Sequence, residues 1–173
     1  MVVGALVAAL IAVSAFVSVP VGAVPITLQV MAIVLAALVL PPSGAFAATS
    51  VYLLLGAIGL PVFAGGKAGL AVLVGPTGGF LLGFVLGATL GAWVRRAVIA
   101  SFGALVADIA AAATVVVVVY MSGWLQLTLV TGMSPIEAAA VGVAPFLVWD
   151  ALKAVAAVGF AVSIRKAGAL PSL

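Results

Sequence analysis

The sequence is organised around the stretch from Gly59 to Phe84, which reads GLPVFAGGKAGLAVLVGPTGGFLLGF. Eight of the chain's 20 glycines and one of its nine charged residues, Lys67, fall in these 26 residues. Glycine at this density permits tight turns but does not build a stable helix, and Pro61 and Pro76 interrupt the backbone further. The flanking sequence is almost purely apolar. Irregular backbone between membrane helices is costly unless it lines a cavity or lies at the surface, so we interpret this stretch as one wall of a ligand site.

The composition is that of an integral membrane protein. Of the 173 residues, 68% are hydrophobic and 5% are charged, which is too little polar surface to cover a soluble domain. The length predicts one transmembrane domain over residues 1–173, all α-helical, with about six spans of roughly 20 residues.

Cys and His are both absent, so we expect no disulfide, no metal site and no catalytic residue. The six basic residues are scattered at the ends of the spans, which argues against nucleic acid as a partner.

The hydrophobic stretches predict where the helices lie. We expect spans at about Val3–Val19, Leu28–Leu40, Ala45–Leu60, Gly78–Val94, Ala97–Tyr120 and Ala144–Ile164. Arg95 and Arg96 are expected to end the fourth span, and Gly123–Gly132 to form an interfacial connection. The segment from Ser134 to Glu137 has the pattern of a capping box, which predicts a short interfacial helix before the last span.

Two patterns of small residues predict close helix packing. Glycine recurs every fourth residue at Gly79, Gly83, Gly87 and Gly91, which gives the fourth span a groove. The first span carries alanines at small-xxx-small spacing, which permit the approach of another helix. The candidate partner-binding alanines are Ala5, Ala8, Ala9 and Ala12.

The distribution of basic residues predicts the orientation. With six spans, one side receives Arg95, Arg96, Arg165 and Lys166, and the other side receives Lys67 alone. The positive-inside rule therefore places both termini in the cytoplasm. The Val19–Gln29 and Pro61–Pro76 loops then face outward, and we expect them to close over a ligand and to become ordered when it binds.

Three charged residues lie inside predicted spans, where charge is expensive and commonly marks a function. Asp150 and Lys153 are three residues apart and share a helix face. They form either an internal ion pair or an acceptor and a donor for a polar ligand in a cavity. Asp108 is either a helix-packing residue or part of the site.

The outer loops supply further candidate ligand contacts. Lys67 is either a solvated charge or the partner of a ligand carboxylate, assisted by the backbone N–H groups of Gly65 and Gly66. The polar side chains near the other loop ends are Thr27, Gln29 and Thr77.

Four motifs in this chain resemble the BioY family. They are VPITLQ at 24–29, GAIGLPVFAGG at 56–66, LVGPTGGFLLGF at 73–84 and DALK at 150–153. The resemblance follows the order of the chain and covers most of it. It implies the six-helix, biotin-specific substrate-binding component (S component) of an energy-coupling factor (ECF) transporter, in a bacterial or archaeal cell membrane.

The resemblance also implies partners and roles for residues. The implied partners are a transmembrane coupling protein and two cytoplasmic ATPases, and the implied ligand is biotin, captured from the outside, with no other cofactor. Asp150 and Lys153 match the aspartate and lysine with which the family contacts biotin. Lys67 departs from the family, which often carries a small or amide residue at this position.

Other functions remain open at the level of sequence. A stand-alone secondary transporter of biotin or a similar vitamin would use Asp108 or Asp150 as a proton carrier, but the chain shows no inverted repeat. A membrane enzyme is disfavoured because the chain has few residues of the types that commonly carry out catalysis. A purely structural bundle would not need the glycine-rich stretch. The chain contains no Gly-x-x-x-x-Gly-Lys-Ser/Thr motif, so any ATP must be used by a partner.

Overall fold

A computed structural model describes residues 2–20 and 24–168 of the chain. Residues 21–23 of the expected Val19–Gln29 loop lie outside the described residues. The helices are α1 (Val2–Ser14), α2 (Gln29–Val39), α3 (Pro42–Ala57), α4 (Leu70–Val74), α5 (Gly78–Thr131), α6 (Pro135–Gly142) and α7 (Leu147–Lys166), with 3-10 turns η1 (Ala64–Gly66) and η2 (Ala144–Phe146). Two short strands, β1 (Ser18–Val19) and β2 (Ile26–Thr27), pair in antiparallel fashion.

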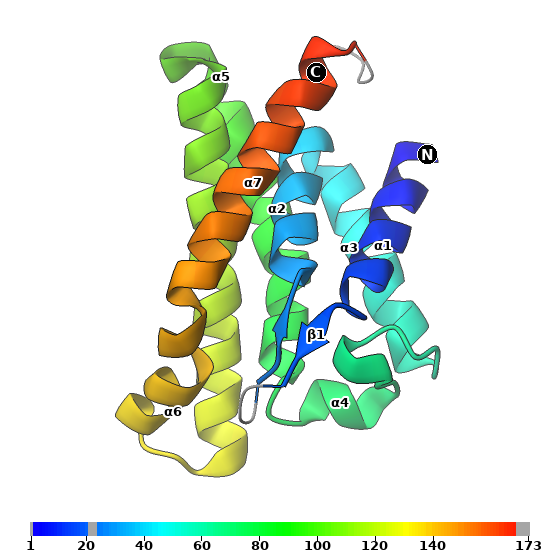
Figure 1. Cartoon of the computed structure of the whole chain (residues 1–173), viewed down its shortest axis with the longest axis vertical. Helices are drawn as coiled ribbons and strands as arrows, with labels where there is room; N and C mark the ends of the chain where they lie inside the picture. Colours follow the sequence, from blue (N-terminus) through cyan, green and yellow to red (C-terminus); the bar gives the residue numbers. More distant parts are fainter. Residues whose placement is uncertain (1, 21–23, 169–173) are drawn as a thin grey trace.

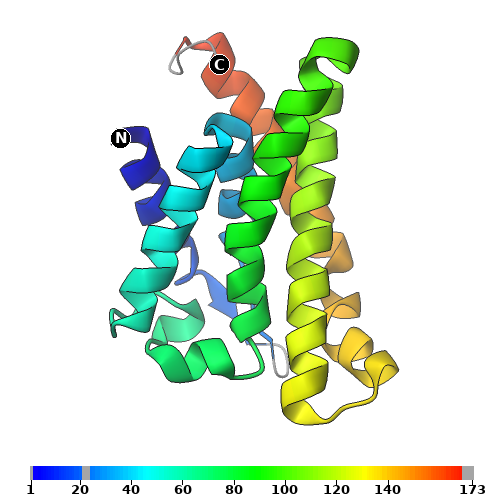
Figure 2. The same ribbon diagram turned by 180° about the vertical axis from the view of Figure 1, so that it is seen from behind.

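Helix α5 consists of two membrane-length halves. Gly103, with φ 79° and ψ 171°, breaks the helix and reverses the chain. The two halves then run side by side, as Figure 2 shows. Counted separately, they join α1, α2, α3 and α7 as the main helices of the described chain and confirm the expected count of six.

The predicted end of the fourth span was wrong. Arg95 and Arg96 lie within a helix that continues to Phe102, and Gly103 makes the turn. Arg95 is buried and paired with Asp108, so its charge is neutralised inside the bundle and does not require a loop. Glycine adopts the positive φ of the turn without the steric cost of a side chain.

The predicted interfacial connection at Gly123–Gly132 was also wrong, because α5 remains helical to Thr131. The hydroxyls of Thr128 and Thr131 donate to carbonyls four residues earlier, so these polar residues are satisfied within the helix. Gly132, with φ 70°, takes the left-handed conformation that commonly ends a helix.

The glycine groove is confirmed, and it holds the two halves of α5 together. A Cβ at Gly83 would lie 2.9 Å from the Cα of Val119, and one at Gly91 would lie 3.0 Å from the carbonyl oxygen of Ala111. Any side chain on this face would push the second half of α5 away.

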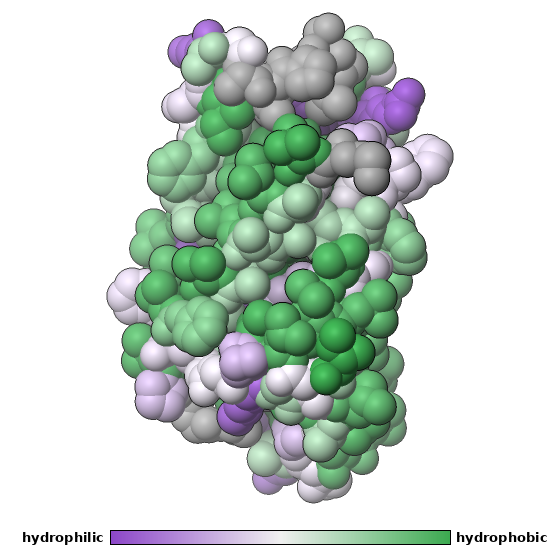
Figure 3. Space-filling view, turned by 90° about the vertical axis from the view of Figure 1, so that its right-hand side faces the viewer, coloured by the Kyte–Doolittle hydropathy of each residue, from purple (hydrophilic) through white to green (hydrophobic). Residues whose placement is uncertain are grey.

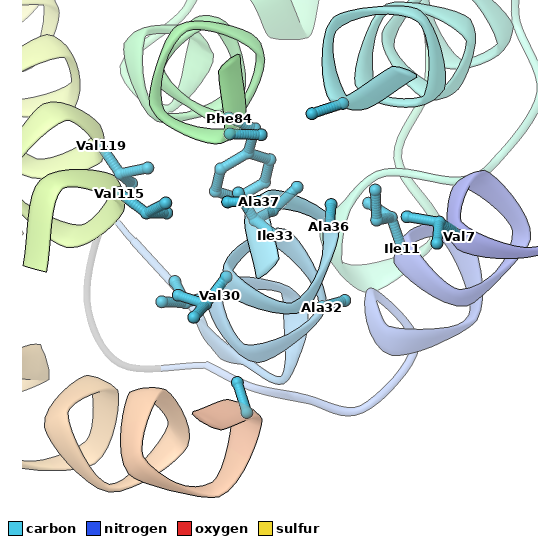
Figure 4. Close-up of a cluster of buried hydrophobic side chains, with 14 of the residues drawn as sticks. Val7, Ile11, Val30, Ala32, Ile33, Ala36, Ala37, Phe84, Val115 and Val119 are labelled. Carbon is cyan, nitrogen blue, oxygen red and sulfur yellow. The ribbon is translucent and has the colours of Figure 1, made fainter. Parts of the chain in front are cut away.

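Helix α2 lies at the centre of the bundle. Nine of its 11 residues are buried. Figure 4 shows Val7 and Ile11 of α1 on one side of α2, and Phe84, Val115 and Val119 of α5 on the other. Because its neighbours cover it on several sides, α2 is apolar over most of its circumference, as expected of a buried helix.

The predicted capping box is confirmed at the start of α6. The Glu137 N–H donates to Ser134 Oγ at 3.3 Å, and the Ser134 N–H donates to Glu137 Oε2 at 2.9 Å. The bond from the Ser134 N–H stabilises the ionised carboxylate and, together with the Ser134 side chain, lowers the pKa of the exposed Glu137 carboxyl below its usual value.

The two ends of the bundle differ. Figure 1 shows both marked chain ends at one end of the bundle, and β1, α4 and α6 at the opposite end. The 54 residues of α5 and the run Pro135–Lys166 are long and apolar enough to cross a membrane. Figure 3 shows a broad apolar surface with hydrophilic residues gathered toward the two ends, as expected of a bundle surrounded by lipid.

Candidate ligand-binding site

An open cavity lies between the β1–β2 hairpin, the glycine-rich stretch, α5 and the start of α7. Its empty volume, including the open mouth, is about 680 Å³. The lining residues are Val24, Pro25, Thr27, Gln29, Val30, Phe63, Ala64, Lys67, Val72, Thr77, Phe80, Leu81, Phe84, Val119, Tyr120, Phe146 and Asp150. Most of these side chains are apolar, and the few polar ones come from different elements, which is the usual construction of a small-molecule site.

The glycine-rich stretch forms one wall of the cavity, as predicted. Phe63 is buried against α3, where its ring contacts Tyr52 edge-on with centroids 5.8 Å apart. Gly56 makes this possible, because a Cβ at that position would overlap the ring of Phe63. The Gly69 N–H donates to the Gly56 carbonyl at 2.7 Å, so the stretch is tied to α3 at two points.

The first turn of α7 supplies the buried acid of the site. Asp150 lines the cavity and is 3% exposed. Its Oδ1 accepts from Lys153 Nζ and its Oδ2 accepts from the Tyr120 hydroxyl, each at 2.8 Å. Each carboxylate oxygen can accept two hydrogen bonds, so Asp150 retains acceptor capacity toward the cavity.

Lys153 does not line the cavity in this structure. Its side chain is 11% exposed and is occupied by the bond to Asp150. The sequence allowed either an internal ion pair or two residues that face a cavity. The structure shows an ion pair in which Asp150 also faces the cavity and Lys153 does not.

Sequence reasoning missed Tyr120, because we expected it to mark only the end of the fifth span. The available signal was its position, since it follows five consecutive valines, Val115–Val119. A hydroxyl after such a run needs a partner when it is buried.

Gln29 and Thr27 lie at the base of the hairpin and line the cavity, so they remain candidate ligand contacts. The Gln29 side-chain amide donates to the Tyr52 hydroxyl at 2.6 Å, and the Gln29 N–H donates to Thr27 Oγ1 at 3.2 Å. The contact with Tyr52 joins α2 to α3. It fixes the direction of a polar side chain that is only 2% exposed.

The glycine-rich wall contributes Lys67 and Thr77 to the cavity. Gly65 and Gly66 were expected to point their N–H groups at a ligand, but they are exposed and do not line the cavity. The Gly66 N–H already donates to the Phe63 carbonyl at 2.9 Å. With φ values of 70° and 73°, the two glycines shape the tight turn that presents Lys67.

Asp108 lies outside the cavity. It is fully buried, and it accepts from Arg95 Nε at 2.8 Å and from Arg165 Nη2. Of the two interpretations that the sequence allowed, the structure supports helix packing.

The alanines of α1 do not form one free face. Ala8 is 8% exposed and belongs to the hydrophobic core, so its expected contact with a partner is wrong. Ala12 is half-buried, whereas Ala5 and Ala9 are exposed.

Comparison with known proteins decides the family. Residues 1–169 match the model of the BioY family. The chain belongs to the BioY family. This confirms the resemblance that the four sequence motifs indicated.

Two relatives and one solved structure extend this result. The chain is 40% identical over 154 residues to a probable biotin transporter BioY of Pyrococcus horikoshii, covering 89% of this chain and 88% of the relative. It is 40% identical over 159 residues to a biotin transporter BioY of Rhodobacter capsulatus, covering 86% and 83%. The fold matches a crystal structure of the S-component for biotin from an ECF-type ABC transporter, with a TM-score of 0.87 and 26% identity over 95% of this chain and 89% of the other.

Proposed function

We propose that this BioY-family chain is the membrane-embedded, biotin-binding subunit of an ATP-driven ECF-type importer. Its family membership, its relatives and its fold support this function. The observation that carries the proposal is a mostly apolar cavity with a buried carboxylate, Asp150, in one wall and a basic residue, Lys67, in another.

The chemistry of biotin matches these two walls. Biotin has a ureido ring with two N–H donors, an aliphatic valerate tail and a terminal carboxylate. Asp150 accepts a ureido N–H, and Lys153 orients this carboxylate through its contact with Oδ1. The aromatic side chains Phe80, Phe84 and Phe146 cover the apolar part of the ligand, and Lys67 faces its carboxylate.

The energy source and the orientation belong to the same proposal. Because the chain has no ATP-binding motif, a transmembrane coupling protein and two cytoplasmic ATPases supply the energy. Both termini face the cytoplasm, and the cavity opens to the outside. This arrangement puts Arg96, Arg165 and Lys166 on the cytoplasmic side, as the positive-inside rule requires.

The exposed small residues of α1, Ala5 and Ala9, are the proposed contact with the coupling protein. Replacing Ala9 with Trp should reduce uptake in vesicles that contain the complete transporter while leaving biotin binding unchanged. Uptake by the chain alone, without the ATPases and at the rate of the complete transporter, would instead favour a stand-alone transporter.

Titration calorimetry of the purified chain in detergent tests the binding function. We expect saturable binding of biotin and at least about a hundredfold weaker binding of lipoate, because lipoate has the same tail and carboxylate but no ureido group to satisfy Asp150. Equal affinity for the two ligands, or no binding of biotin, would contradict the proposal.

A further inference from the structure

Gln126, on the second half of α5, reaches across the bundle to the glycine-rich wall. Its side-chain Nε2 donates to the carbonyl oxygens of Leu73 and Gly75, at 2.7 Å and 2.8 Å. These two acceptors are 53 and 51 residues away in the sequence. A single amide group therefore joins the end of α4 to a helix on another side of the cavity.

Two glycines create the space for this contact. A Cβ at Gly78 would overlap the Leu73 carbonyl and would lie 2.6 Å from Gln126 Nε2. A Cβ at Gly79 would lie 2.6 Å from the Cβ of Gln126. The glycine pair at the start of α5 thus admits the Gln126 side chain as well as the neighbouring helix.

The element that Gln126 holds has little stability of its own. Helix α4 has five residues, none of its residues is buried, and no side chain caps its N-terminus. A helix this short is unstable in isolation, and its last carbonyls have no partner inside the helix. Gln126 supplies a donor to one of these carbonyls, and its second bond fixes the turn that follows.

The segment fixed in this way forms part of the cavity wall. Val72 lies on α4 and Thr77 follows the turn, and both side chains line the cavity. Gln126 itself is not among the lining residues. Its effect on a ligand is therefore indirect and acts through the position of the wall.

We propose that Gln126 is a positioning residue for ligand binding. It holds residues 72–77, which form part of the cavity wall, in their binding geometry before the ligand arrives. The binding part of this inference rests on the proposed function. It also revises one expectation from the sequence, because the last part of the Pro61–Pro76 loop is then a pre-formed wall and not a segment that becomes ordered on binding.

Hydrogen exchange of the ligand-free protein, followed by measurement of the biotin dissociation rate, tests this role. Gln126→Met keeps the approximate shape without a donor, and Gln126→Glu replaces the donor with an acceptor that repels the carbonyls. Each should speed amide exchange in residues 70–75 by about tenfold and leave exchange in α2 and α7 unchanged. Each should also speed biotin dissociation by about fivefold to tenfold.

Thr128→Val is the matched control. The Thr128 hydroxyl bonds to the Trp124 carbonyl of its own helix, two residues beyond Gln126, so its loss should change neither measurement. Unchanged exchange in residues 70–75 of both Gln126 variants would overturn the proposal. So would an equal rise in exchange throughout the chain, or failure of both variants to fold while the control folds, because either result would make Gln126 a residue of general stability.

Biotin binding and the fixing of the cavity wall by Gln126 are tested separately. If the wild-type chain does not bind biotin, the proposed function fails, but the exchange data still decide whether Gln126 holds the wall. Local exchange that rises without any change in biotin dissociation would overturn the positioning role and leave the proposed function intact.

Discussion

Two buried aspartates lie at different levels of this bundle. Each is bound to at least one basic side chain, but the two have different roles. Asp108 is held by Arg95 and Arg165, and it joins both halves of α5 to the end of α7. Asp150 is held by Lys153 of its own helix and by the Tyr120 hydroxyl. Only the second of these clusters contributes to the lining of the cavity.

The difference shows how a membrane protein uses buried charge. Both carboxylate oxygens of Asp108 are bound by guanidinium groups from other segments, so its charge holds the helices of the bundle together. Asp150 has its cation three residues away on the same helix, so that pair does not cross-link the bundle. The carboxylate instead faces the cavity, where a ligand can reach it.

The largest expected effect is loss of stability on removing Asp108. Asp108→Asn leaves Arg95 without its counter-charge inside the bundle, at a cost of about 3–5 kcal/mol. We expect a large fall in the thermal unfolding midpoint in detergent, with the biotin affinity of the remaining folded protein within about twofold of wild type. Arg96→Gln, at an exposed neighbouring charge, is the control. If the unfolding midpoint of Asp108→Asn equals that of the wild type, the contacts of Asp108 with the two arginines do not stabilise the fold.

The opposite pattern is expected at the cavity. Asp150→Asn and Lys153→Met should each weaken biotin binding by at least about tenfold, because the first removes the counter-charge of Lys153 and the second leaves the buried Asp150 carboxylate without its cation. Their unfolding midpoints should fall less than that of Asp108→Asn. Calorimetric titration with wild-type affinity in both variants would reduce the pair to a structural ion pair.

A smaller effect is expected for Tyr120→Phe, which removes one donor to Asp150 and keeps the ring. Biotin affinity should fall by about threefold to tenfold, as for the loss of one hydrogen bond to a charged group. Thr114→Val on the same half of α5 is the control, since that hydroxyl bonds only to Ala110 among the described residues. If both variants bind like the wild type, Tyr120 does not orient Asp150.

The smallest effect is expected at Lys67, which is exposed and therefore screened by solvent. Lys67→Ala should weaken biotin binding by about twofold to fivefold, and should weaken binding of biotin amide less, because only biotin loses a charge-assisted contact. Parallel titration with both ligands measures this difference. Equal losses would place the carboxylate contact elsewhere in the cavity.

The features that local sequence could predict were those with local causes. The capping box at Ser134, the four-residue glycine spacing from Gly79 and the cavity wall within Gly59–Phe84 were predicted because their chemistry lies within a short segment. The six helices followed from the length of the apolar runs. The family motifs added the function.

Three of the failures involved partners distant in sequence. Arg95 was expected to end a span because nothing nearby shows that Asp108 neutralises it from across the turn. Ala8 was assigned to a partner because spacing does not reveal which face of α1 the core already covers. Gln126 was placed in a loop, although its two acceptors lie more than 50 residues away.

The most direct test of the central claim is an experimental structure of the chain with biotin bound. We predict that a ureido nitrogen lies about 2.7–3.2 Å from a carboxylate oxygen of Asp150. The valerate carboxylate should point toward Lys67 and Thr77, and Asp108 should still be bound to its two arginines. Biotin bound in the reverse direction, with its carboxylate at Asp150, or bound outside this cavity, would contradict the account.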